Sequence, residues 1–180
     1  MSSEFGHHFA GLPKGAETTQ LEDDLTAATP TPEARVTHAL QEQSSRILAN
    51  WALRVSTFPT FRATPDINLA QLQEGLPELL DALLGAIATP DPALDPILQS
   101  RIADLAETQG RKWATDGFSI GVLISELNEL RAELWAAILR ITDDDPSLAG
   151  TPLLLQERLR GAFDPLIVDA AEAWVEAQRQ

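Results

Sequence analysis

The sequence predicts an all-α protein, a bundle of four or five helices, on three observations. Apolar residues recur at helical spacing in each segment after about residue 33, no segment has the pattern of a strand, and proline or glycine separates one segment from the next. The most apolar segment follows Gly117, and its main stripe has spacings of 4, 3, 4, 4 and 3. A helix with this pattern is expected at the centre of the bundle and mostly buried. The stripe consists of Leu123, Leu127, Leu130, Leu134, Ile138 and Ile141.

Length and charge narrow the class of protein. The chain has 180 residues, enough for one domain with a sizeable core. Its net charge is −14, and its 13 Lys and Arg residues are scattered among 27 acids, so binding to nucleic acid or to an anionic membrane surface is not expected. No apolar run approaches the ~20 residues of a membrane span, no signal peptide is recognisable, and there is no Cys. These features predict a cytoplasmic location.

The chain divides into two parts. Residues 1–32 hold Gly, Pro, Thr, Ser and acids without an apolar period, which predicts a disordered or loosely packed acidic tail. Residues 33–180 are predicted to form one helical domain, and they contain no internal repeat.

The first two predicted helices lie before residue 90. The first is expected to run from a Thr31 cap to about residue 58, because the residue before Pro59 avoids the α region. The second is expected over residues 66–88. Pro77 lies inside it and predicts a kink or a break, because proline removes a backbone hydrogen bond and clashes with the preceding turn.

The third and fourth predicted helices are separated by a glycine turn. Asp95 is expected to cap the third helix, with Pro96 at its first position. Gly117 is expected to end that helix in the left-handed conformation. Ser119 then caps the fourth helix, which carries the long apolar stripe.

The fifth predicted helix is capped by Thr151, with Pro152 at its first position, and continues close to Gln180 without a stop signal. Asp164-Pro165 predicts a kink, or a restart with Asp164 as cap. Apolar residues occur on several sides of this helix, more than one bundle can easily bury, so a homodimer through the helix is expected. The residues outside its main stripe are Leu154, Val168, Trp174 and Val175.

Patterns of catalytic and metal-ligating residues are not found in the sequence. His38 is the only His outside the tail, and it lies one turn before Glu42, as in an ordinary surface pair. The acids of the fourth helix lack the Glu-x-x-His pattern of di-iron bundles, and haem has no suitable axial ligand. We therefore expect a protein that is not an enzyme and that holds no metal ion and no cofactor.

One polar constellation remains as a possible ligand or switch site. Glu126 is an acid on a very apolar helix, and an unpaired buried charge is costly, so it needs a donor. Arg111 and the indole of Trp113 are the candidate donors, and Arg131 can stack on Trp135 one turn later. The alternative is a structural clasp that fixes the register of two helices. The candidate residues are Gln109, Arg111, Trp113, Glu126, Arg131 and Trp135.

A longer segment resembles a known family. Residues 109–131 read Q-G-R-K-W-x-x-x-G-F-S-I-x-x-L-I-x-E-L-x-x-L-R, preceded by L-P-E-L-L at residues 76–80 and by Trp51. Over about residues 33–145 the chain resembles the N-terminal helical domain of the RsbT co-antagonist RsbRD family, although Gln109 stands where His is expected and Trp113 where Arg is expected. The resemblance implies a bacterial, cytoplasmic sensory or regulatory domain, normally followed by an effector domain. It also makes a globin-like arrangement an alternative to a simple bundle.

Two functions follow as hypotheses. The first is a non-catalytic signal-transduction input and dimerisation module, N-terminal to an effector domain, whose partners are a second copy through the last helix and an effector domain or regulatory protein. The alternative is a helical bundle that binds a small molecule or a lipid in a pocket around Trp113 and Trp135.

Overall fold

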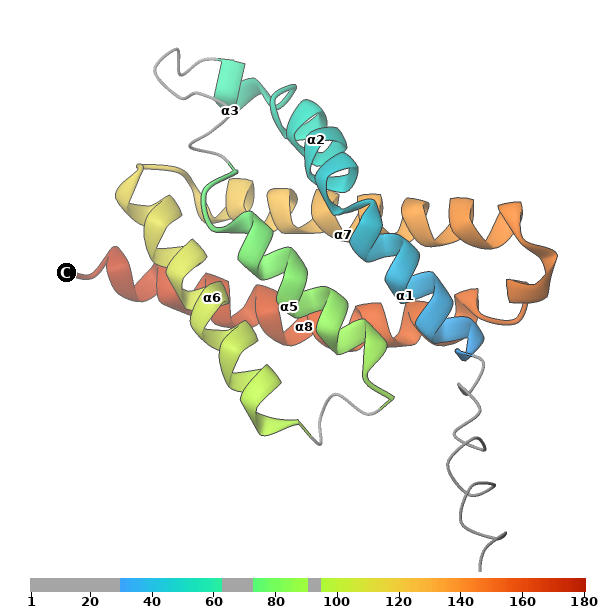
Figure 1. Cartoon of the computed structure of the whole chain (residues 1–180). Helices are drawn as coiled ribbons and strands as arrows, with labels where there is room; N and C mark the ends of the chain where they lie inside the picture. Colours follow the sequence, from blue (N-terminus) through green and yellow to red (C-terminus); the bar gives the residue numbers. More distant parts are fainter. Residues whose placement is uncertain (1–29, 63–72, 91–94) are drawn as a thin grey trace, which may run out of the picture. The chain divides into compact units, whose positions relative to one another are not determined.

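The computed structural model of the protein describes residues 30–62, 73–90 and 95–180 (Figure 1). Seven α-helices and one 3-10 helix lie in these ranges, which hold no strand. The prediction of an all-α bundle is therefore confirmed, with more helices than the four or five expected. The expected tail up to residue 29 and the first part of the second expected helix lie outside the described residues.

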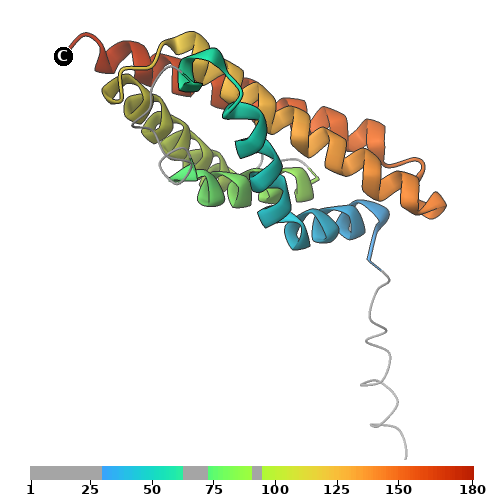
Figure 2. The same cartoon turned by 90° about the horizontal axis from the view of Figure 1, so that it is seen from above.

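Two helices replace the single first helix that the sequence predicts, α1 (Pro32–Glu42) and α2 (Ser44–Val55), and the short helix α3 (Pro59–Arg62) follows its predicted end. The first break lies at Gln43, and Figure 2 shows α1 and α2 meeting there at an angle. The bend allows the apolar stripes of both helices to face one core. The buried apolar side chains of these stripes are Val36, Leu40, Ile47, Trp51, Ala52 and Val55.

The glycine positions that the sequence singles out do separate helices. Helix α5 (Leu76–Ala88) begins directly after Gly75, which has φ +80°, so the predicted break near Pro77 is confirmed. Helix α6 (Pro96–Thr115) ends before Gly117, which has φ +79°. Glycine takes this left-handed conformation without the steric cost that a Cβ atom brings.

The remainder of the chain is an antiparallel pair of long helices, α7 (Ile120–Asp144) and α8 (Pro152–Ala177), joined through the 3-10 helix η2 (Pro146–Leu148) (Figures 1 and 2). Helix α8 continues through Pro165, so the predicted restart with Asp164 as cap is wrong. Buried residues on both sides of the proline hold the helix against the core, and this packing outweighs one lost backbone hydrogen bond.

Side-chain caps begin three of the helices as predicted. The hydroxyl of Thr31 accepts the N–H of residue 34 at 3.2 Å, and the carboxylate of Asp95 accepts the N–H of residue 98 at 3.0 Å. The hydroxyl of Ser119 accepts the N–H of residue 122 at 3.4 Å. Thr151 precedes α8 as predicted, but its side chain makes no capping bond. Its backbone is already in the α region, whereas a capping residue is normally extended.

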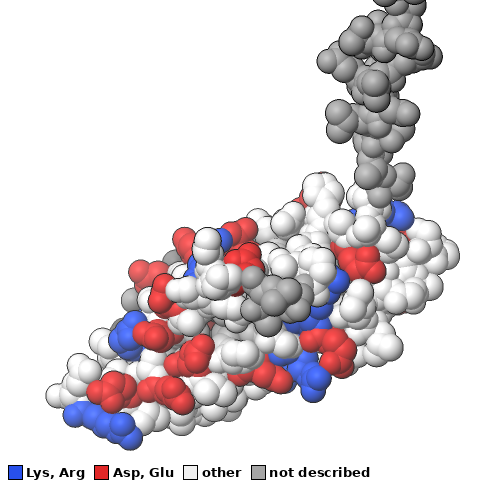
Figure 3. Space-filling view, turned by 90° about the horizontal axis from the view of Figure 1, so that it is seen from below, with Lys and Arg blue, Asp and Glu red and all other residues white. Residues whose placement is uncertain are grey.

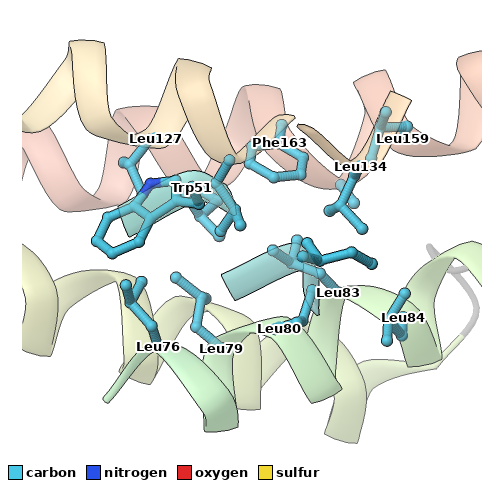
Figure 4. Packing of buried hydrophobic residues seen from close by; sticks show 14 of the residues in the cluster. Trp51, Leu76, Leu79, Leu80, Leu83, Leu84, Leu127, Leu134, Leu159 and Phe163 are labelled. Carbon is cyan, nitrogen blue, oxygen red and sulfur yellow. The ribbon is translucent and has the colours of Figure 1, made fainter. Parts of the chain in front are cut away.

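The apolar core lies between α5 on one side and the α7–α8 pair on the other. Figure 4 shows the leucines of α5 pointing toward apolar side chains of α7 and α8, with Trp51 of α2 among them. Helix α5 is the most completely buried of these elements, since 8 of its 13 residues are buried against 9 of 25 in α7. The helix after Gly117 is expected from the sequence to be the central and most buried element, and this expectation is wrong. A second row of apolar residues on it, Ile120, Ile124, Trp135 and Leu139, stays partly exposed, and Leu139 is 36% exposed.

A glycine sets the distance between α6 and α8. A Cβ atom at Gly110 would lie 2.1 Å from the backbone oxygen of Ala170 and 3.1 Å from the Cβ atom of Ala173. Only a residue without a side chain permits this approach. The two helices therefore pack backbone against backbone at this point.

The C-terminal end of α8 is hydrogen-bonded to the last turn of α6 and to the α6–α7 turn. The indole N–H of Trp174 donates to the backbone oxygen of Phe118 at 2.9 Å, and the side-chain amide of Gln178 donates to the backbone oxygen of Ala114 at 3.1 Å. Of the four tryptophans, Trp51 and Trp113 are buried, while Trp135 and Trp174 are partly buried against the same core. All four tryptophans therefore contribute large apolar area to the core.

Charged side chains of both signs are interspersed on the surface that Figure 3 shows, with acids more numerous than bases. Arg35 of α1 bonds both Asp145 and Ser147, and so ties the first helix to the start of η2. Among the described helices, none combines the length and the apolar character needed to cross a membrane.

Candidate functional site

The candidate site is centred on Glu126 of α7, a carboxyl with no exposed surface. The side-chain amide of Gln109, on α6, donates to Glu126 Oε1 at 3.1 Å. The indole N–H of Trp51, on α2, donates to the backbone oxygen of Glu126 at 3.1 Å. Glu126 thus joins three helices through one side-chain and one backbone bond. We call Trp51, Gln109 and Glu126 the Glu126 clasp.

The electrostatics of Glu126 favour its neutral form. Burial raises the pKa of this carboxyl well above its ordinary value of 4.5. The hydrogen bond from Gln109 and the charge of Lys112 act in the opposite direction, with smaller effect on the pKa. The second oxygen, Oε2, is buried and accepts no hydrogen bond. With a single amide donor, the carboxyl is stable in the core when it is protonated and neutral. The charged form would need water or a further donor.

The expected donors of Glu126 are wrong, because neither Arg111 nor Trp113 bonds it. Arg111 lies two residues after Gln109, on the opposite side of α6, and pairs with Glu107 at the surface at 2.9 Å. The Trp113 indole N–H is buried without a hydrogen-bond partner. A helical periodicity argument places Gln109 toward α7, and an uncharged amide is the cheaper group to bury.

Trp113 belongs to an aromatic cluster at the end of α6. Its ring centroid lies 4.6 Å from that of Phe118 and 5.5 Å from that of Phe61, both in edge-on contact. The ammonium of Lys112 lies 5.7 Å from the same centroid. The cluster fastens α3 and the α6–α7 turn to α6 beside the Glu126 clasp.

Arg131 and Trp135 lie away from the clasp, in a groove between α7 and α8. The guanidinium of Arg131 donates to Asn128 Oδ1 at 2.7 Å and pairs with Asp164 at 3.4 Å. The six candidate residues are thus divided by the structure. Gln109 and Glu126 bond each other, Trp113 lies one turn after Gln109 in the aromatic cluster, Arg131 and Trp135 share a groove, and Arg111 lies on the opposite side of α6.

A second buried carboxyl on α7 escaped the sequence argument. Glu133 is 2% exposed and accepts the side-chain amide of Asn50 at 2.9 Å. Arg54 and Arg140 lie 3.4 Å and 3.6 Å from its oxygens. The available signal was spacing, because Glu133 lies seven residues after Glu126 and therefore on the same buried face. Unlike Glu126, it is surrounded by donors.

The buried polar groups of this region make contacts between helices. Within the described ranges, no cluster of three or more His, Asp or Glu residues is placed to hold a metal ion. The fold and the site therefore define an all-α domain whose polar core couples helices.

A comparison with protein families identifies the domain more closely. The family described as the RsbT co-antagonist protein rsbRD N-terminal domain matches residues 45–180, and the chain belongs to this family. The match confirms the resemblance and extends it across the whole of α8. It makes the chain a signalling-related regulatory domain. Neither the curated proteins nor the solved structures provide a match.

Proposed function

We propose that the domain is a non-catalytic, cytoplasmic input module of bacterial signal transduction that acts as a homodimer and precedes an effector domain. The observation that carries the proposal is the position of the Glu126 clasp. The clasp links α2, α6 and α7. The end of α6 and the α6–α7 turn then accept hydrogen bonds from Gln178 and Trp174 at the C-terminal end of α8. A stimulus that breaks the Glu126 clasp would therefore alter the hydrogen bonds that hold the C-terminal end of α8.

The exposed side of α8 is the part of the module proposed to meet a second copy. Leu153, Leu154 and Val168 are 71%, 42% and 54% exposed. Apolar exposure along one terminal helix is typical of an interface. A regulatory protein or an effector domain would read the resulting change in α8.

Hydrogen–deuterium exchange tests the coupling. The variants Glu126→Gln and Gln109→Leu alter the clasp on α6 and α7 without touching α8 directly. We expect both to change amide exchange in the last turns of α8, together with the monomer–dimer equilibrium. Glu42→Gln, at an exposed surface pair on α1, is the control and should leave both unchanged. Exchange in α8 that is identical in all four proteins contradicts the proposed coupling.

A small-molecule or lipid-binding bundle is the second candidate function. The groove between α7 and α8 favours this function through two candidate residues, Arg131 and Trp135. The groove is not the expected pocket around both Trp113 and Trp135, because Trp113 does not line it. The experiment described in the next subsection tests this function.

A further inference from the structure

The groove between α7 and α8 has the dimensions of a ligand site. Its volume is about 420 Å³. Small-molecule sites usually enclose ~300–1,000 Å³, so the groove suits a compact ligand. Both helices supply its walls, with Asn128, Arg131 and Trp135 from α7 and Gln156, Leu159 and Arg160 from α8.

One part of the groove is aromatic and apolar. Trp135 packs against the core with part of its surface and lines the groove with the rest. Leu159 is 3% exposed and lies at the base. An indole face beside an aliphatic floor favours a flat ring over a flexible chain, because offset ring stacking adds to the apolar area that is removed from water.

The other part of the groove carries two guanidiniums, those of Arg131 and Arg160. Each is paired with an acid of α8, Arg131 with Asp164 and Arg160 with Glu157, so the four side chains are formally neutral together. Arg160 donates one N–H to Glu157 at 2.7 Å, and Arg131 is engaged by Asn128 and Asp164. A guanidinium has five N–H donors, so both arginines retain donors for a further acceptor.

We propose that this groove binds a small aromatic carboxylate, with the ring against Trp135 and the carboxylate on the guanidiniums of Arg131 and Arg160. The carboxylate matches the planar fork of an arginine in a two-bond contact. The side-chain amide of Gln156, which also lines the groove, supplies a hydrogen bond for a polar ring substituent. The ligand touches both α7 and α8, so its binding stabilises the pair by mass action. The inference names the ligand class of the second candidate function and rests on it.

Calorimetric titration of the whole chain with 2-naphthoate is the test. Three matched compounds separate the contributions: 2-naphthamide keeps the ring without the charge, octanoate keeps the carboxylate without the ring, and 1-naphthylmethylamine reverses the charge. We expect saturable binding of one naphthoate per chain and binding of each matched compound that is weaker by about tenfold or more.

Variants assign the binding to the groove. Arg131→Gln, Arg160→Gln and Trp135→Leu should each weaken naphthoate binding by about tenfold. Asp164→Asn removes the negative charge that competes for Arg131 and should strengthen naphthoate binding by about twofold or more. Arg46→Gln, at an exposed arginine of α2, is the matched control and should have no effect. If Trp135→Leu does not fold, the arginine variants, which alter surface side chains, still decide the question.

Equal binding of naphthoate and naphthamide, equal binding of octanoate, or unchanged binding in the double variant Arg131→Gln, Arg160→Gln would each overturn the inference. Failure here is distinguishable from failure of the signalling proposal, because the exchange experiment on α8 uses no ligand. A chain that shows coupling of the Glu126 clasp to α8 and no naphthoate binding loses only the groove site.

Discussion

Gln109 of α6 donates its side-chain amide to the carboxyl of Glu126 of α7 at 3.1 Å, and this carboxyl has no exposed surface. A single neutral donor offsets only part of the cost of burying a charged carboxylate. The contact therefore stabilises the folded domain most when Glu126 is protonated. This makes the clasp a contact whose strength depends on pH.

The pH dependence of stability is the first prediction. Burial raises the pKa of Glu126 above the 4.5 expected in the unfolded chain, so the folded chain retains a proton that the unfolded chain releases. The free energy of unfolding must then fall as pH rises from about 4.5 through the folded-state pKa. Below 4.5 the carboxyl is protonated in both states, so it adds no pH dependence to the stability. Glu126→Gln removes this loss, so its stability relative to the natural chain should increase with pH.

Urea unfolding at several pH values between 4 and 8 measures this difference. The pH values should be ~1 unit apart, because one proton-binding site titrates over about two units. Glu107→Gln, at a surface pair on α6, is the matched control. A stability difference between Glu126→Gln and the natural chain that stays constant over the whole range would show that Glu126 is not retained as an acid in the folded state.

The backbone contact between α6 and α8 gives the second prediction. Gly110→Ala places a methyl group where the backbone oxygen of Ala170 lies 2.1 Å away, so the helices must separate. We expect a loss of about 1–3 kcal/mol or more in the free energy of unfolding. Gly161→Ala is the matched control, because a Cβ atom there meets nothing within 4 Å. It should stabilise the helix by about 0.5–1 kcal/mol. Similar effects of the two substitutions would contradict the close approach.

Local chemistry explains which parts of the fold could be predicted. The caps at Thr31, Asp95 and Ser119 and the left-handed Gly117 depend on atoms within a few residues, and all four are found. The break at Gln43 was not predicted, because it depends on where the two apolar stripes meet the core.

The site shows the same division. That Glu126 needs a donor follows from its position on an apolar helix, but the identity of the donor depends on how α6 turns toward α7. The residue types at the end of α6 favoured Arg111 and the Trp113 indole as donors, whereas the donor in the structure is the side-chain amide of Gln109. The separation of Arg131 and Trp135 from the clasp depends on the packing of α8 against α7, which no local pattern encodes.

The leucines at the centre of the core supply the third prediction. Leu127 and Leu134 of α7 are 1% and 0% exposed and face the leucines of α5 (Figure 4). Replacing either with Ala should lower the free energy of unfolding by about 2–5 kcal/mol, because each leaves a cavity in addition to the lost apolar burial. Leu153→Ala, at a position 71% exposed, should change it by less than about 0.5 kcal/mol. Denaturant unfolding of the three variants measures these values. Losses below ~0.5 kcal/mol at both buried sites, as for a surface substitution, would place α7 at the periphery.

The N-terminal tail carries the fourth prediction. Residues 1–30 lack an apolar period, so we propose that they do not contribute to the folding of the helical domain. Deleting them should leave the thermal melting temperature unchanged. A large decrease would mean that the tail packs on the domain, and substitution of Phe5 and Phe9 in the full chain would then locate the contact.

The last prediction concerns association of two copies through α8. Val168 is 54% exposed on this helix, whereas Val175 is partly buried and lines a groove with Ile120 of α7. Val168 is therefore the better probe. Replacing the partly buried Val175 would also disturb contacts inside the chain. A two-fold dimer needs only one self-complementary surface, and an apolar helix face provides it.

Light scattering at several concentrations should give a mass about twice 19.6 kDa at high micromolar concentration. Val168→Glu should return the mass to that of one chain without unfolding it, because an unpaired charge buried in an interface is costly. Ile97→Glu, at an apolar residue of α6 that is 81% exposed, is the matched control and should leave the dimer intact. A mass of one chain for the natural protein at every concentration would contradict the dimer. Helix α8 would then pack only against the core of its own chain.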